Sequence, residues 1–134
     1  MKSENHGTDY LIDSNILIYA SKQVEGMIAF MSNVKLKDAR VCASWCTYIE
    51  ALGYHKLTPD EKDYLEVAFS AIEKLDVSEQ VAGKATELRQ QRRMGLGDSI
   101  IAATAIVNGL CLVTHNTQDF DWIDELAIND PILS

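Results

Sequence analysis

The chain has 134 residues, of which 47% are hydrophobic and 24% charged, which suffices for one domain with a substantial core but not for two. Its net charge of −8 excludes a general electrostatic attraction to nucleic acid, so any such binding has to be local. No apolar run approaches the length of a membrane span, and residues 1–9 form a polar leader unlike a signal peptide, so we expect a single cytoplasmic domain over residues 1–134.

The first predicted element is a short strand from Tyr10 to Ile12, which leads through a tight turn into a helix over residues 16–20. Asp13, Ser14 and Asn15 form the turn, and all three residue types favour helix starts. Because Ser14 and Asn15 could cap the helix equally well, capping leaves the carboxylate of Asp13 less explained. Asp13 is expected at the carboxyl end of a strand.

A second short helix is predicted over residues 24–34, then a strand over residues 40–43 and, after Ser44, a helix over residues 45–53. In this last helix Trp45, Ile49 and Leu52 share one face, and Glu50 flanks that face, so its carboxylate is expected to turn partly inward. An ordinary surface glutamate remains an equally good interpretation. Six residues beyond Ser44 also amount to about 9 Å of helix rise away from the strand edge.

The middle of the chain carries a capping box, because Thr58 and Glu61 enclose a proline at the first helical position. It predicts a helix over residues 62–74, followed by a short strand over residues 75–77. Ser78 then caps a helix whose buried face is Val81, Ala85 and Leu88.

Basic residues crowd the end of this helix, with only one acidic residue, Glu87, among them. They are Lys84, Arg89, Arg92 and Arg93. Such a cluster is either a solvated helix face or a patch that contacts phosphates, and the sequence leaves both interpretations open.

The most distinctive stretch runs from Gly95 to Asn116. Two glycines form a turn, Asp98 opens a helix that is apolar almost all round, Gly109 closes it, and a buried strand is predicted over residues 110–114. For Asp98 alone, an N-cap is the plainer interpretation. A helix that feeds a parallel strand runs antiparallel to it, however, so Asp98 is expected near the carboxyl edge of the sheet, where open α/β sheets bind ligands.

Polar residues follow this strand directly. Thr114, Asn116 and Asp119 lie just beyond its carboxyl end, although asparagine and aspartate are also common turn formers. A weak last strand is predicted over residues 126–128.

Alternating strands and helices predict a parallel α/β sheet, which gathers Asp13, Asp98 and Asp119 at one edge, with Glu50 as a possible fourth acid. Carboxylates without a partnering lysine favour Mg²⁺ or Mn²⁺, and the scattered cysteines and histidines argue against zinc. A metal held by few carboxylates and several waters suits phosphoryl chemistry.

Four ordered motifs carry a family resemblance. They are Leu11-Ile12-Asp13-Ser14-Asn15-Ile16-Leu17-Ile18-Tyr19-Ala20, Glu50 in its helix, Gly97-Asp98-Ser99-Ile100-Ile101-Ala102-Ala103-Thr104-Ala105, and Leu112-Val113-Thr114-His115-Asn116-Thr117-Gln118-Asp119-Phe120. Together they resemble PIN-domain ribonucleases, in particular the VapC-type toxins of bacterial type II toxin–antitoxin systems. The resemblance implies a three-layer α/β/α fold with a small, mostly parallel central sheet flanked by helices. It also implies an endoribonuclease that uses Mg²⁺ or Mn²⁺ and leaves a 5′-phosphate and a 3′-hydroxyl.

By position, the resemblance makes Asp13, Glu50, Asp98 and Asp119 the acidic quartet, with Asp13 and Asp98 as the primary metal ligands. It makes Ser14, Asn15, Thr114 and Asn116 the polar residues that support the quartet. Two departures stand out: His115 replaces a common arginine, and Asn116 stands where some relatives carry an aspartate, which leaves the fourth acidic position open between Asn116 and Asp119. The resemblance further implies a homodimer and a cognate antitoxin that inhibits it.

Two rival hypotheses remain. A receiver-like phosphoacceptor domain would need an acidic pair after the first strand and a lysine after the fifth, and this chain has neither. A catalytically silent binding module that acts through a protein partner would keep the fold, although retention of all four acids counts against it.

Overall fold

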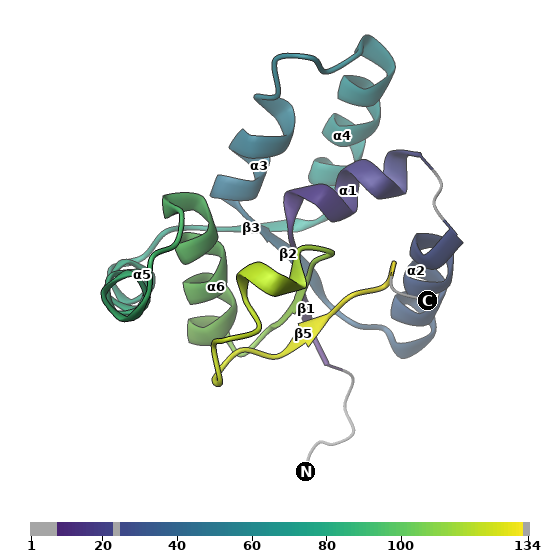
Figure 1. The fold of residues 1–134 in the computed structure, drawn as a ribbon. Coiled ribbons are helices and arrows are strands. Elements are labelled where there is room, and N and C mark those ends of the chain that lie inside the picture. The colour runs from purple at the N-terminus through teal and green to yellow at the C-terminus, as the bar shows by residue number, and fades with distance from the viewer. Residues whose placement is uncertain (1–7, 23–24, 133–134) are drawn as a thin grey trace.

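Five short strands form one parallel sheet in the order β3-β2-β1-β4-β5 (Figure 1). The strands are β1 (Tyr10–Ile12), β2 (Val41–Ser44), β3 (Glu73–Leu75), β4 (Cys111–Val113) and β5 (Ile128–Asn129). The computed structural model describes residues 8–22 and 25–132, so most of the polar leader predicted at residues 1–9 lies outside the described residues. Because all pairings are parallel, every strand points its carboxyl end to the same edge.

Within the described residues, six α-helices connect the strands. They are α1 (Ser14–Ser21), α2 (Glu25–Lys37), α3 (Trp45–Leu52), α4 (Pro59–Ala71), α5 (Glu79–Gln91) and α6 (Leu96–Asn108), and a 3₁₀ turn, η1 (Thr117–Asp119), follows β4. The predicted starts of α4 and α5 are confirmed, since Thr58 and Glu61 form the capping box and Ser78 accepts a hydrogen bond from the Val81 amide. None of the described helices is long and apolar enough to cross a membrane.

The sheet separates two hydrophobic cores, as expected of a three-layer α/β/α fold. Alternate residues of β1 point to opposite faces: Leu11 packs with α5 and α6, whereas Tyr10 and Ile12 pack with α1, α2 and α4. Figure 1 shows α5 and α6 together on one side of the sheet. Both faces of the strands are therefore covered, and only the strand ends remain to form a site.

Several element boundaries differ from the prediction. The helix predicted over residues 62–74 ends at Ala71, and the following strand is Glu73–Leu75 rather than residues 75–77. The ammonium of Lys74 donates hydrogen bonds to the carbonyl oxygens of Phe69 and Ile72, which satisfies the last turn of the helix from within the strand. Helix α2 also continues three residues beyond the predicted end at residue 34.

The predicted face of α3 is wrong. Trp45 and Ile49 are 39% and 68% exposed, whereas Thr47 and Ala51 are fully buried. The small side chains of Thr47 and Ala51 let α3 lie close to its neighbours α1, α4 and α6. Periodicity alone favours the larger apolar side chains as the buried ones, and close helix packing overrides that preference here.

The end of α6 provides a test of the predicted turn chemistry. Gly109 closes the helix with a φ of 66°, so Gly109→Ala should destabilise the protein by roughly 1 kcal/mol, because side chains are strained in the left-handed region. Gly83→Ala is the matched control, since a Cβ there meets nothing within 4 Å in the middle of α5. It should stabilise the protein by roughly 0.5–1 kcal/mol. Urea denaturation measures both, and equal shifts for the two variants would contradict the assignment of Gly109.

Candidate active site

Asp13 lies at the carboxyl edge of the sheet, between β1 and α1. Its backbone amide donates to the Val113 carbonyl (3.0 Å), which ties it to the end of β4. The residue is 4% exposed, and its carboxylate accepts three hydrogen bonds, from the Ser14 amide (2.8 Å), the Asn15 side chain (3.1 Å) and the Thr114 hydroxyl (2.9 Å). Asp13 is thus itself the N-cap of α1, and its orientation is set from two sides.

The four predicted supporting residues all belong to this network, but in different ways. Ser14 acts through its backbone amide, whereas Asn15 uses its side chain twice, because its oxygen also accepts from the His115 amide (3.2 Å). The Thr114 hydroxyl donates to Asp13 and accepts from the Asn116 amide (3.1 Å). These contacts connect the β1–α1 turn to the loop after β4.

His115, which replaces the arginine common in the resembling family, is held on the outer side of this loop. Its Nδ1 lies 3.0 Å from the carboxylate of Asp130, just after β5, and its ring packs edge-on against Tyr19. The Asp130 carboxylate also accepts from the Ile132 amide (3.0 Å). The His115 side chain therefore joins the loop to the chain after β5.

Asp98 is not the N-cap of α6. The helix starts earlier than predicted, at Leu96, with Gly95 as the N-cap and no side-chain hydrogen bond at the cap. Asp98 is the third residue of the helix, so its carboxylate does not cap the helix. Its position in the first turn of α6 still favours a negative charge through the helix dipole.

Glu50 reaches the same place from α3 despite the helix rise that separates it from the sheet edge. Its Oε2 lies 2.7 Å from where a Cβ of residue 97 would stand, and the sulfur of Cys46 lies 3.6 Å from that point. Gly97 is therefore required for the close approach of α3 to the first turn of α6. From the sequence, Gly97 is predicted only to form a turn; its place directly before Asp98 is the signal that could have indicated this close approach.

Three of the carboxyl groups have pKa values raised by burial and by the charges of the other acids. Burial raises the pKa of Asp13 despite its hydrogen bonds, and the charge of Asp119 raises it further. Burial, then Asp13 and Asp98, raise the pKa of Glu50; burial, then Asp13 and Asp119, raise the pKa of Asp98. Each carboxylate is thus destabilised by burial and by its neighbours.

A thiol in α3 responds to the same charges. Burial, followed by the charges of Glu50, Asp13 and Asp98, raises the pKa of Cys46 to about 11. The Cys46 thiol is therefore uncharged at neutral pH and adds no charge to the acidic cluster.

Asp119, one of the two residues predicted for the fourth acidic position, lies at the end of η1, and its charge affects Asp13 and Asp98. Its amide donates to the Asn116 carbonyl (3.1 Å), and its own carbonyl accepts from the Trp122 indole (3.1 Å). Asp119 and Glu50 are exposed whereas Asp13 is buried, so the cluster extends from the sheet edge to solvent. Within the described residues, none of the four acids forms an ion pair with lysine or arginine.

The donor set suits a hard divalent cation. Oxygen ligands that repel one another and lack a basic partner are stabilised by Mg²⁺ or Mn²⁺, which take carboxylate oxygens and retain several waters. In residues 8–22 and 25–132, no three His, Cys, Asp or Glu side chains converge closely enough to enclose a metal by themselves. A cation with one or two direct carboxylate ligands, completed by water, fits this arrangement.

The structure divides the predicted basic cluster. The ammonium of Lys84 is paired with Glu125 (2.9 Å) and Glu87 (3.5 Å), whereas the Arg92 guanidinium lies 5.4 Å from the centre of the Trp122 ring. Arg89 and Arg93 line a cavity between α5 and α6. The positive charge of Lys84 is therefore balanced locally, and that of the arginines is not.

Comparisons with known proteins agree on one family. The sequence profile described as "PIN domain" matches residues 10–126. The chain is 31% identical over 130 residues to "Ribonuclease VapC1" of Haemophilus influenzae strain R2866, and 29% identical to "tRNA(fMet)-specific endonuclease VapC" of Shigella flexneri. In both cases the match covers 90% of this chain and 96% of the relative.

Solved structures show the same likeness. VapBC-1 from nontypeable Haemophilus influenzae superposes with a TM-score of 0.76 at 26% identity, covering 92% of this chain and 98% of that chain. A toxin–antitoxin complex from Klebsiella pneumoniae gives a TM-score of 0.72 at 27% identity, with the same coverage. The PIN-like three-layer α/β/α fold expected from the sequence is confirmed.

Removing one charge from the cluster should stabilise the metal-free protein. A carboxyl group whose pKa is raised by folding favours the fold at low pH, and this stabilisation is lost as the pH rises through its folded pKa. At neutral pH and with EDTA, Asp98→Asn should therefore raise Tm by roughly 2–6 °C. Near pH 4 the gain should shrink, because the wild-type carboxyl groups take up protons.

Thermal unfolding with and without Mn²⁺ measures this effect. Mn²⁺ should raise the Tm of the wild type and raise that of Asp98→Asn much less, since ligand binding stabilises only a fold that binds it. A variant that is less stable than the wild type with EDTA at neutral pH would contradict the repulsion among these acids.

Proposed function

Because this chain belongs to the PIN domain family, we propose that it is an endoribonuclease and the toxin of a type II toxin–antitoxin pair. The observation that carries the proposal is the unpaired acidic cluster at the carboxyl edge of the sheet, where Asp13, Glu50, Asp98 and Asp119 act on one another's charge. Relatives are named ribonucleases, and similar solved structures are toxin–antitoxin complexes. Retention of all four acids counts against a catalytically silent binding module.

Asp13 and Asp98 are the primary ligands for Mg²⁺ or Mn²⁺ in this proposal, and Glu50 and Asp119 bind it directly or through water. The bound cation would supply an activated water and would polarise the phosphate. The chain's own contribution is orientation: Asn15 and Thr114 fix the Asp13 carboxylate from two elements, while Ser14 and Asn116 support them through backbone amides.

The proposed substrate is RNA, bound by local contacts because the chain as a whole is acidic. Arg89, Arg92 and Arg93 are the main contacts in this proposal. Lys84 contributes less, since two carboxylates already balance its charge. An RNA substrate also agrees with a cytoplasmic location for the enzyme.

The proposed partners are a second copy of this chain and a cognate antitoxin. An acidic pocket that reaches solvent suits inhibition by a peptide with basic side chains, because arginine forms strong hydrogen bonds with carboxylates. The antitoxin would then inhibit the enzyme by placing a positively charged side chain among Asp13, Glu50 and Asp98.

Cleavage of a mixed RNA pool by the purified, antitoxin-free protein tests the activity. Cutting should require Mg²⁺ or Mn²⁺, stop with EDTA, leave 5′-phosphate ends, and fall roughly 100-fold or more in Asp98→Asn. Circular dichroism of the variant controls for folding. Binding of RNA without cleavage under every metal condition, by a protein that binds Mn²⁺, would favour the silent binding module instead.

Gly97 offers a second test of the site. Gly97→Ala places a Cβ 2.7 Å from the Glu50 carboxylate, so Glu50 has to move, and we expect cleavage to fall roughly 10-fold. Gly95→Ala is the control, because a Cβ there meets nothing within 4 Å. In a Glu50→Gln background the Gly97 substitution should add little to the loss. Equal, additive losses in both backgrounds would show that Gly97 does not act through Glu50.

A further inference from the structure

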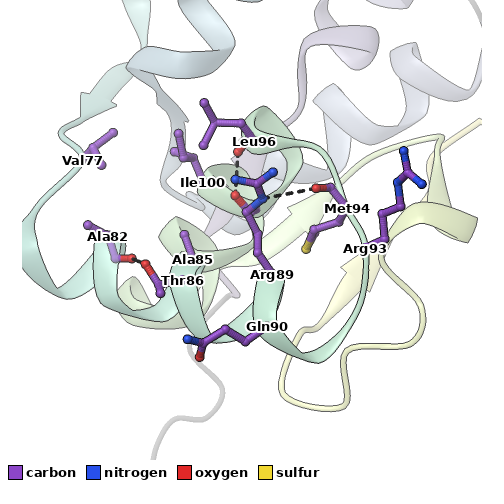
Figure 2. Close-up of a pocket in the computed structure, with 11 residues that line it drawn as sticks. Val77, Ala82, Ala85, Thr86, Arg89, Gln90, Arg93, Met94, Leu96 and Ile100 are labelled. Carbon is purple, nitrogen blue, oxygen red and sulfur yellow. Dashed lines mark hydrogen bonds between the residues drawn. The ribbon is translucent and has the colours of Figure 1, made fainter.

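A cavity of about 760 Å³ lies between α5 and the first turn of α6 (Figure 2). Its apolar wall includes Val77, Ala85, Leu96 and Ile100, and its polar rim includes Arg89 and Arg93. Figure 2 shows Arg89 extending from α5 toward Leu96 and Met94. The cavity is separate from the acidic cluster and has no part in holding the metal.

The cavity and the acids flank the same helical turn. Residues 96 and 100 lie on one face of α6, and Asp98 projects about 200° away from Leu96, because successive residues of an α-helix are about 100° apart. An α-helix with its side chains is about 10–12 Å wide, a distance that a few nucleotides of an extended strand cover. A strand bound at the acids is therefore long enough to reach the cavity within a few nucleotides.

The charge of the cavity contrasts with that of the chain. Within the described residues, neither Arg89 nor Arg93 forms an ion pair, although the chain carries a net charge of −8. Arg89 donates one hydrogen bond, from Nε to the Met94 carbonyl (3.3 Å), which directs the guanidinium across the cavity and leaves its terminal N–H groups available. The Arg89 guanidinium beside an apolar wall, with Arg93 at the rim on the other side of Met94 (Figure 2), matches a phosphate next to a base.

We propose that this cavity is a subsite for one nucleotide of a single-stranded RNA substrate, a few nucleotides away from the scissile phosphate. Arg89 and Arg93 contact its phosphate, and the wall formed by Ala85, Leu96 and Ile100 receives its base. This subsite rests on the proposed function. It would make the enzyme prefer unpaired RNA, whose bases are free to enter the cavity. A base held in a duplex could not leave its stack to enter the cavity.

Affinity for RNA in a cleavage-deficient background tests the subsite. Asp98→Asn protein is titrated into fluorescein-labelled single-stranded RNA with EDTA, and anisotropy gives Kd at several salt concentrations. Adding Arg89→Gln and Arg93→Gln together should raise Kd roughly 10-fold or more and reduce the salt slope by about 1 per lost contact. Lysine at both positions should recover part of the affinity, because the charges return.

Two further variants separate the cavity from net charge and from folding. Arg40→Gln removes one positive charge elsewhere, from an arginine that is paired with Glu73 beside the amino ends of the strands, and should change Kd less than twofold. Ala82→Trp fills the cavity from an exposed position on α5 and should weaken binding without unfolding the protein. In the protein that retains Ala82, removing single bases from the RNA identifies the position whose base contributes most to affinity. In the Ala82→Trp protein, removing that same base should no longer lower the affinity.

The outcomes distinguish this proposal from the proposed function. If the protein with both arginines neither binds nor cuts RNA, the proposed function fails. If it cuts RNA and the double glutamine variant binds with unchanged Kd and salt slope, only the subsite is wrong. If light scattering shows instead that this variant changes oligomeric state while RNA affinity is unchanged, the cavity is a contact between two copies of the chain.

Discussion

Repulsion among carboxylates at one edge of the sheet is the constraint on which the rest of this structure depends. Asp13 is buried there, and burial and neighbouring charge both oppose its ionisation. Three hydrogen bonds from two different elements hold it nonetheless. Uncompensated carboxylates lower the stability of the metal-free protein. In the proposed function, a bound cation would offset this cost.

The parallel sheet makes this concentration of charge possible. Helices cover both faces of the strands, so the two hydrophobic cores stabilise the domain without help from the strand ends. The carboxyl edge is then free to carry groups that cost stability. Loops bring Asp13 and Asp119 to this edge, whereas Glu50 and Asp98 come from helices, and Gly97 lets those two helices approach each other.

The sequence by itself determined the layered fold and indicated which carboxylates lie at one edge of the sheet. Strand and helix signals are local: the capping box at Thr58, the cap at Ser78 and the left-handed Gly109 each act within a few residues. Alternation of such elements implies a parallel sheet with one carboxyl edge, so Asp13, Asp98 and Asp119 could be placed together without any structure. Four motifs in order then identified the family.

Only the tertiary structure decided what depends on contacts between distant segments. The buried face of α3 was predicted wrongly, because close packing selected Thr47 and Ala51 over the larger Trp45 and Ile49. The role of Gly97 depends on how near α3 comes to α6, and the separation of Lys84 from the arginines depends on Glu125, forty-one residues away. Local patterns specify which groups are present, whereas helix packing and long-range pairing decide which of them meet.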